Sequence, residues 1–175
     1  MENLKKEAIN LFNNKNYKKS LDIFLQILQK EPKSKDILLF IAYNYMQIRN
    51  YEKGLFYLEE VNKLDKNNIQ VFYNKGVCFS MLGRNREAIN NFSKSLSIKD
   101  DFFESYIQIG QLLKRKNLLD DAIKIYEAAL IKVNQKDLVN VNLSEIYYLK
   151  KNYELSRKFA EDALTLNSKN YFAII

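Results

Sequence analysis

The fold is decided by residues 69–102, IQVFYNKGVCFSMLGRNREAINNFSKSLSIKDDF. Small and apolar residues recur in this stretch three or four positions apart, in two runs: Phe72, Gly76 and Phe79, then Ala88, Phe92 and Ser95. Residues at such intervals lie on one face of an α-helix. Gly83-Arg84 stands between the two runs. The stretch therefore predicts two amphipathic helices joined by a short turn.

The same pattern recurs with a period of 34 residues from Met1 almost to the end of the chain. Five segments result: 1–34, 35–68, 69–102, 103–136 and 137–170. Their eighth residues are all small: Ala8, Ala42, Gly76, Gly110 and Ser144. Their twentieth residues are small too: Ser20, Gly54, Ala88, Ala122 and Ser156. Because small residues let two backbones approach closely, we expect the two helices of each segment to cross at these columns.

Larger residues occupy matching columns. The eleventh column holds Leu11, Tyr45, Phe79, Leu113 and Tyr147. The twenty-fourth holds Phe24, Leu58, Phe92, Tyr126 and, as an exception, Ala160. A tyrosine opens the second helix in three segments: Tyr17, Tyr51 and Tyr153. These columns resemble the unit of the tetratricopeptide repeat (TPR) family, although Pro32 is the only proline of that unit retained here. The resemblance implies an all-α fold, a right-handed superhelical α-solenoid of helix–turn–helix repeats.

Composition argues against several classes of protein. The chain has no histidine, which removes the commonest general base and metal ligand. Its one cysteine, Cys78, can form no disulfide within the chain. We find no phosphate-binding glycine loop, no metal-ligand cluster and no apolar run long enough to span a membrane. We therefore expect a non-catalytic, cytoplasmic protein without a cofactor or metal.

The last residues, Tyr171–Ile175, read YFAII and match the opening of a sixth repeat. A solenoid normally ends on a helix with a polar outer face, whereas this segment is apolar. We expect it to begin a sixth or capping helix that is truncated, as in a fragment of a longer protein. The alternative is that this segment docks on a second copy, which would make the chain a self-assembling structural module.

The family resemblance also predicts a binding surface. It implies that the second, fifth, sixth, ninth and thirteenth residues of each repeat line a concave groove. In the first two repeats these residues are Glu2, Lys5, Lys6, Ile9, Asn13, Asp36, Leu39, Phe40, Tyr43 and Gln47. Aromatic anchors beside amide groups suit the side chains and backbone of a bound peptide. We predict a protein or peptide partner held by these groove residues: Leu39, Phe40, Tyr43, Tyr73, Asn74, Val77, Met81, Gln108, Gln111 and Asn142.

Two recognition modes of the TPR family can be compared with this surface. The amides Asn74, Gln108 and Asn142 recur in the sixth column and resemble the asparagine ladder of O-GlcNAc transferase; the alternative is an ordinary polar surface. The carboxylate clamp of co-chaperones requires paired cations. The matching positions hold Lys5, Ile9, Phe40, Gln70 and Asn74, of which only Lys5 fits. We therefore expect the clamp to be absent.

Basic residues surround the turn inside each repeat, and the formal net charge is +7. They are Lys15, Lys18, Lys19, Arg49, Lys53, Arg84, Arg86, Lys114, Arg115, Lys116, Lys150 and Lys151. One interpretation is an edge that binds an acidic protein or nucleic-acid surface. The other is that exposed turns simply favour Lys and Arg. Nearby acidic residues and the lack of interleaved aromatic residues argue against nucleic acid.

Overall fold

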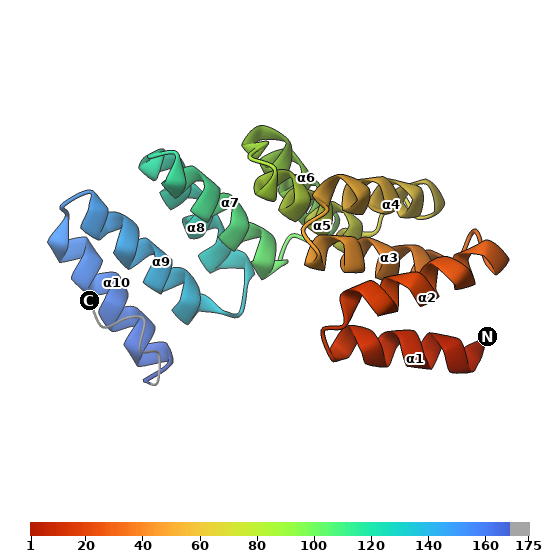
Figure 1. The fold of residues 1–175 in the computed structure, drawn as a ribbon. Helices are drawn as coiled ribbons and strands as arrows, with labels where there is room; N and C mark the ends of the chain where they lie inside the picture. Colours follow the sequence, from red (N-terminus) through yellow and green to blue (C-terminus); the bar gives the residue numbers. More distant parts are fainter. Residues whose placement is uncertain (169–175) are drawn as a thin grey trace. The chain divides into compact units, whose positions relative to one another are not determined.

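A computed structural model describes residues 1–168, and all regular structure in that range is helical (Figure 1). Its helices are α1 (Glu2–Asn13), α2 (Tyr17–Lys30), α3 (Lys35–Gln47), α4 (Tyr51–Leu64), α5 (Ile69–Met81), α6 (Asn85–Ile98), α7 (Phe103–Arg115), α8 (Leu119–Lys132), α9 (Lys136–Leu149) and α10 (Tyr153–Leu166). The predicted all-α fold is confirmed. The segment predicted to open a sixth helix lies outside the described residues. Within residues 1–168, no helix is long and apolar enough to cross a membrane.

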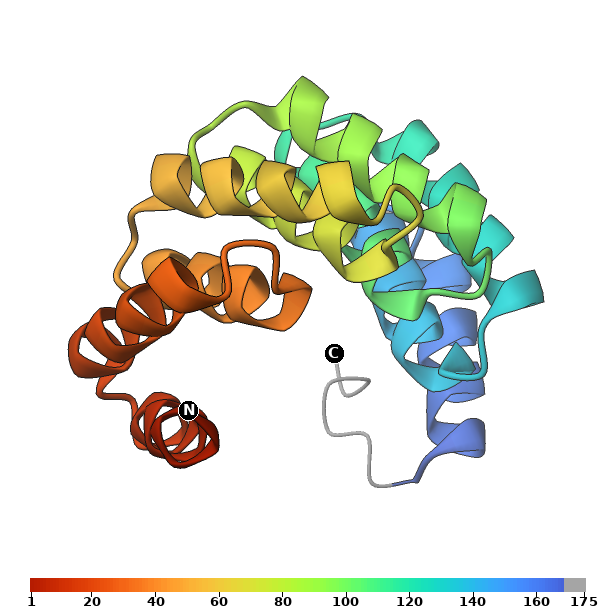
Figure 2. The same ribbon diagram turned by 90° about the vertical axis from the view of Figure 1, so that its right-hand side faces the viewer.

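The helices form pairs with the predicted period. The second helix of each pair begins at Tyr17, Tyr51, Asn85, Leu119 and Tyr153, which confirms the three tyrosines as first residues of their helices. From α1 to α5, and again from α7 to α10, successive helices run side by side and reverse direction at each turn (Figures 1 and 2). The fifth pair departs slightly from the expected repeat boundary, because α9 begins at Lys136.

One backbone motif closes the first helix of every pair. A residue with positive φ follows that helix in all five pairs: Lys15 (60°), Arg49 (62°), Gly83 (74°), Asn117 (58°) and Lys151 (60°). In the first pair, the N–H of Lys15 donates to the carbonyl of Phe12 at 2.9 Å, and that of Asn16 donates to the carbonyl of Leu11 at 2.8 Å. These bonds define a Schellman motif, which satisfies carbonyls at the helix end. The motif turns the chain into the second helix.

The small columns lie where the two helices of a pair meet. All ten residues of these columns are buried. The Ser20 hydroxyl donates to the Ala8 carbonyl at 2.9 Å, and the Ser144 hydroxyl donates to the Ser156 carbonyl at 2.8 Å. In the first and fifth pairs, the eighth residue therefore touches the twentieth. The expectation that the helices cross at these columns is confirmed.

The described chain divides into two compact units. The interpretation of residues 1–170 as one repeat domain stays a prediction. The N-terminal unit comprises Met1–Asn91 and the C-terminal unit begins at Phe92, so the division falls within α6. The N-terminal unit has two core clusters, one around Phe24 and Ile41 and one around Leu58 and Val71. The C-terminal unit has a cluster that includes Tyr126, Leu143 and Ile146. Each unit thus has buried apolar residues of its own.

Candidate functional site

The candidate site is a cavity of about 240 Å³ in the N-terminal unit. It is lined by residues of α1, α2 and α3: Lys5, Ile9, Phe24, Asp36, Ile37, Leu39, Phe40 and Tyr43. Leu39, Phe40 and Tyr43 are three of the predicted groove residues, and the structure brings them together here. Most of the lining is apolar, as expected of a site that buries part of a ligand.

Aromatic rings build one wall of this cavity. Phe40 stacks on Phe24, with ring centroids 4.8 Å apart and planes at 8°. The Phe12 ring is 6.0 Å from Phe40 and the Tyr43 ring is 6.4 Å from it, both edge to face. Phe24 is fully buried, whereas Phe40 is half-buried. Phe24 therefore anchors Phe40, and a ring held in this way presents a fixed surface to the cavity.

Tyr43 adds a polar group to this wall. Its side chain is half-buried, and burial raises the pKa of its phenol, which stays neutral near pH 7. Within residues 1–168, the Tyr43 hydroxyl has no hydrogen-bond partner. A neutral phenol can both donate and accept a hydrogen bond. Tyr43 thus combines an apolar ring with a group that can bond to a ligand.

Two charged residues line the same cavity. The Lys5 ammonium lies 2.8 Å from a carboxylate oxygen of Glu31, and this hydrogen bond raises the pKa of Lys5. Asp36 lies in the first turn of α3, where the partial positive charge of the helix N-terminus favours a carboxylate. The charge of Lys5 is therefore already paired, whereas Asp36 forms no ion pair within residues 1–168.

The predicted groove residues of α5 lie apart from this cavity lining. Tyr73, Val77 and Met81 are four residues apart and share one face of the helix, where Met81 is 58% exposed. The Asn74 amide donates to the Gln70 carbonyl in the same helix at 2.7 Å. These four residues belong to the N-terminal unit but do not line the cavity of about 240 Å³.

The remaining predicted residues belong to the C-terminal unit. Gln108 and Gln111 are half-buried on α7. On α9, the Asn142 amide donates to the Leu138 carbonyl at 2.7 Å and its oxygen accepts from the Tyr126 hydroxyl at 3.1 Å. Asn142 therefore has a structural role, because its side-chain oxygen accepts the hydrogen bond of a buried tyrosine hydroxyl. The amide ladder stays a prediction.

Sequence reasoning selected only part of the cavity lining. The inner columns of the family pattern included Lys5, Ile9 and Asp36, yet none was chosen as a site residue. Phe24 was noted only as a large residue of the twenty-fourth column, and Ile37 was not considered. The sequence offers no signal that sets Phe24 apart, because Phe92 and Tyr126 stand in the same column of other repeats and do not line this cavity.

Several basic turn residues already have acidic or aromatic partners. The Arg84 side chain lies 2.9 Å from Glu87 and 4.6 Å from the Phe79 ring centroid. Lys114 lies 2.6 Å from Glu145. Lys150 pairs with Asp120. These contacts, together with the Schellman positions of Lys15, Arg49 and Lys151, give much of the predicted basic edge a structural role.

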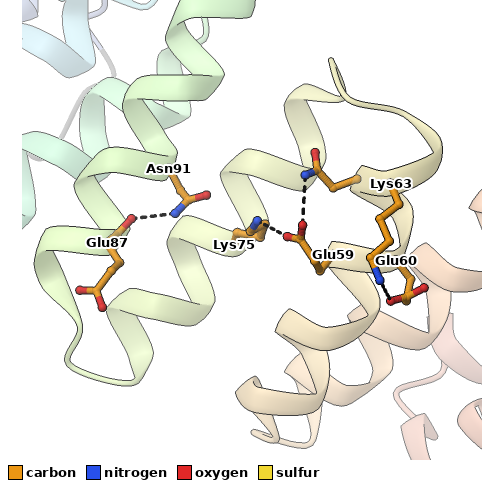
Figure 3. Close-up of polar contacts among 7 residues, drawn as sticks. Glu59, Glu60, Lys63, Lys75, Glu87 and Asn91 are labelled. Carbon is orange, nitrogen blue, oxygen red and sulfur yellow. Dashed lines mark hydrogen bonds and ion pairs between the residues drawn. The ribbon is translucent and has the colours of Figure 1, made fainter.

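A polar cluster joins α4 to α5 (Figure 3). The Glu59 carboxylate accepts from the Lys75 ammonium at 2.5 Å and from the Asn62 amide at 3.4 Å. The hydrogen bond from Lys75 lowers the pKa of Glu59, so the carboxylate stays ionised near neutral pH. A general acid requires a raised pKa instead. The cluster therefore serves as a link between neighbouring repeats.

Comparison with known proteins identifies the family. The family model of the tetratricopeptide repeat matches residues 36–68, 69–102, 103–130 and 139–170. The chain belongs to the tetratricopeptide repeat family. The α1–α2 pair precedes the first matched segment and has the same helix–turn–helix form as the four other TPR pairs.

Relatives and solved structures agree with this assignment. BBSome complex member BBS4 of Bos taurus is 24% identical over 91% of this TPR chain, which spans 31% of that protein. The DnaJ homolog subfamily C member 7 homolog of Dictyostelium discoideum is 25% identical over 74% of the chain, matching 18% of its own length. The chain therefore spans less than a third of either relative.

Two solved structures share the fold. The crystal structure of MamA superposes with a TM-score of 0.81 at 17% identity, covering 93% of this chain and 95% of MamA. YrrB, described as a TPR protein with an unusual peptide-binding site, gives a TM-score of 0.72 at 16% identity, covering 98% of this chain and 88% of YrrB. At these identities the likeness establishes the fold alone.

Proposed function

We propose that this chain is a non-catalytic scaffold that binds a peptide segment of a partner protein. TPR proteins are protein-interaction scaffolds in general, and the finer proposal concerns where the peptide binds. We assign one bulky apolar side chain of the peptide to the cavity beside Phe40, with Leu39 and Tyr43 as further contacts. The observation that carries the proposal is the rigid aromatic wall formed by Phe40 on buried Phe24.

The size of the cavity favours a side chain over a larger ligand. Pockets for drug-sized small molecules commonly have volumes of about 300–1,000 Å³. An apolar cavity of about 150 Å³ is enough for a benzene molecule. The cavity here, at about 240 Å³, lies between these limits. It has room for one aromatic or large aliphatic side chain, as in a peptide whose remaining residues lie outside.

The similarity to YrrB supports the same class of ligand, because that TPR protein is described as having a peptide-binding site. The similarity concerns the fold, so the peptide sequence that YrrB recognises does not transfer to this chain. Since the chain spans 31% of BBS4, the assembly of that protein does not transfer either.

The test uses peptides selected from a random phage-displayed library on the immobilised full chain. Affinity of the selected peptides is then measured for the wild type and for Tyr43→Ala, which removes a ring from the cavity. We expect roughly five- to thirtyfold weaker binding, because a ring buried in an interface contributes about 1–2 kcal/mol or more. Circular dichroism checks that the variant keeps its helices.

The matched control is Phe56→Ala, which removes a ring that is 59% exposed on α4 and does not line the cavity. Its affinity should equal that of the wild type. Adding Tyr73→Ala to Tyr43→Ala tests whether the peptide continues along α5, and we expect a further loss. Equal losses for Tyr43→Ala and Phe56→Ala would show that the cavity is the wrong site.

A further inference from the structure

The charges around the cavity are unbalanced. Among the described residues that line it, only Lys5 and Asp36 are charged. Lys5 is already bonded to Glu31, and Glu2, Glu31 and Asp36 all act on its charge. The Lys5 ammonium thus has a carboxylate partner in Glu31, which leaves Asp36 as the carboxylate of the lining without an ion pair of its own within residues 1–168.

Asp36 carries the uncompensated part of this charge. It is exposed, and within residues 1–168 it forms no ion pair or hydrogen bond through its side chain. The neighbouring Lys35 is engaged elsewhere, because its ammonium lies 3.3 Å from Asp65. Lys5 interacts electrostatically with Asp36 but is itself bonded to Glu31. Within residues 1–168 no ion pair therefore neutralises Asp36, although it lines the same cavity as Phe40 and Tyr43.

We propose that the cavity selects a peptide in which a lysine or arginine lies next to the bulky apolar side chain, and that Asp36 pairs with this cation. The inference rests on the proposed function and names the chemistry of its ligand. A peptide carboxylate would be disfavoured at this site, because it would approach Asp36 and a lysine whose charge is already satisfied.

Asp36 also has a structural effect that must be separated from binding. A carboxylate in the first turn of a helix stabilises that helix, so Asp36→Asn should lower the melting temperature slightly. A purely structural role would weaken the binding of every peptide to the same extent. A role in recognition would instead change which peptides are preferred, and this preference is the quantity to measure.

The experiment uses acetylated and amidated nine-residue peptides with a central phenylalanine or leucine. Each flanking position is occupied in turn by Lys, Arg, Ala or Glu, and dissociation constants are measured by fluorescence anisotropy on the full chain. We expect Lys or Arg at one flanking position to bind about three- to tenfold more tightly than Glu, because the exposed Asp36 attracts a cation and repels a carboxylate. Raising the salt concentration should reduce the difference.

Variants assign this preference to one residue. Asp36→Asn should abolish the preference, and Asp36→Lys should reverse it in favour of Glu. Asp22→Asn is the matched control, because it makes the same change of charge at an exposed position of α2 outside the cavity lining. It should retain the full preference.

The outcomes separate the two proposals. If the peptides bind and Tyr43→Ala weakens them, but the preference is missing or survives Asp36→Asn, this inference is overturned and the proposed function stands. If no peptide of the set binds, and phage selection also returns none, both proposals fail. A preference that is lost in Asp36→Asn and kept in Asp22→Asn supports both.

Discussion

Gly110 shows at the scale of a single residue why the eighth column must stay small. A Cβ atom built on Gly110 would lie 2.2 Å from Cζ of Tyr126, a side chain that is fully buried and hydrogen-bonded to Asn142. The ring cannot move without breaking that bond. We expect Gly110→Ala to lower the free energy of unfolding by about 2 kcal/mol, as in other overpacked cores. Urea denaturation followed by circular dichroism measures the loss.

Gly54→Ala is the control for this substitution. Its new Cβ would lie 3.1 Å from Cγ of Met46, part of a flexible side chain that can shift. Alanine also favours a helix over glycine by up to about 1 kcal/mol. The free energy of unfolding should therefore change little. Equal losses at Gly54 and Gly110 would mean that Tyr126 is not the cause.

The left-handed turn residues give a second prediction at this scale. Arg49 has a φ of 62°, a conformation that costs a non-glycine residue about 1–2 kcal/mol. Arg49→Gly should remove this cost. Glycine loses more conformational freedom on folding, which offsets part of the gain, so we expect a net stabilisation of about 0.5–1 kcal/mol. Thermal unfolding should show a higher melting temperature.

Gly83→Ala is the reverse experiment. Gly83 has a φ of 74° and no atom within 4 Å of its added Cβ, so only the backbone is strained. We expect a loss of about 1 kcal/mol. A stabilised Gly83→Ala variant would refute the Schellman explanation of this column.

These residues also show what the sequence could predict. The small columns were identified from the period alone, because steric limits apply equally in every repeat. The positive φ of Lys15 and Lys151 was not predicted, because lysine carries no signal for it, unlike Gly83 and Asn117 in the same column. The bond between Tyr126 and Asn142 was also missed, because it depends on how two side chains approach across neighbouring helices.

At the scale of elements, polar contacts link the beginning and end of a repeat. The Lys35 ammonium lies 3.3 Å from Asp65, and the Asn167 amide donates to Asp137 at 3.0 Å. In both repeats, one partner lies at or near the start of the first helix and the other directly follows the second helix. Such contacts between exposed groups contribute little individually, about 0–1 kcal/mol, but help to fix the hairpin geometry.

The Glu59–Lys75 pair provides a pH-dependent test at this scale. Folding lowers the pKa of Glu59, so its contribution to stability is present above the unfolded value of about 4.3 and is lost as pH falls through the folded value. Glu59→Gln should destabilise the chain by about 0.5 kcal/mol at pH 7, and this difference from the wild type should shrink toward pH 3. Urea midpoints at both pH values give the comparison.

Glu60→Gln is the matched control, because Glu60 pairs with Lys63 on the same helix and not across to α5 (Figure 3). Its effect at pH 7 should be smaller, since a pair within one helix does not link two repeats. A Glu59→Gln difference that stays constant from pH 7 to pH 3 would contradict the role given to the ionised carboxylate.

At the scale of the molecule, the repeat period predicted the helices. The period runs through every segment, so it contains no signal for a boundary between Asn91 and Phe92. The candidate site was also predicted only in part, because the family columns describe single positions and not the packing around them. The family columns assign Leu39, Phe40 and Tyr43 to one face, but they do not show that Phe24 and Ile37 complete a cavity there.

The claim that the cavity takes a peptide side chain is tested most directly by methyl NMR. The full chain, labelled at Ile and Leu methyl groups, is titrated with a peptide selected on the wild type. We predict chemical-shift changes at the cavity residues Ile9, Ile37 and Leu39, and loss of these changes in Tyr43→Ala. Shifts at Ile107 and Leu138 in the C-terminal unit, with none at the three cavity residues, would contradict the account.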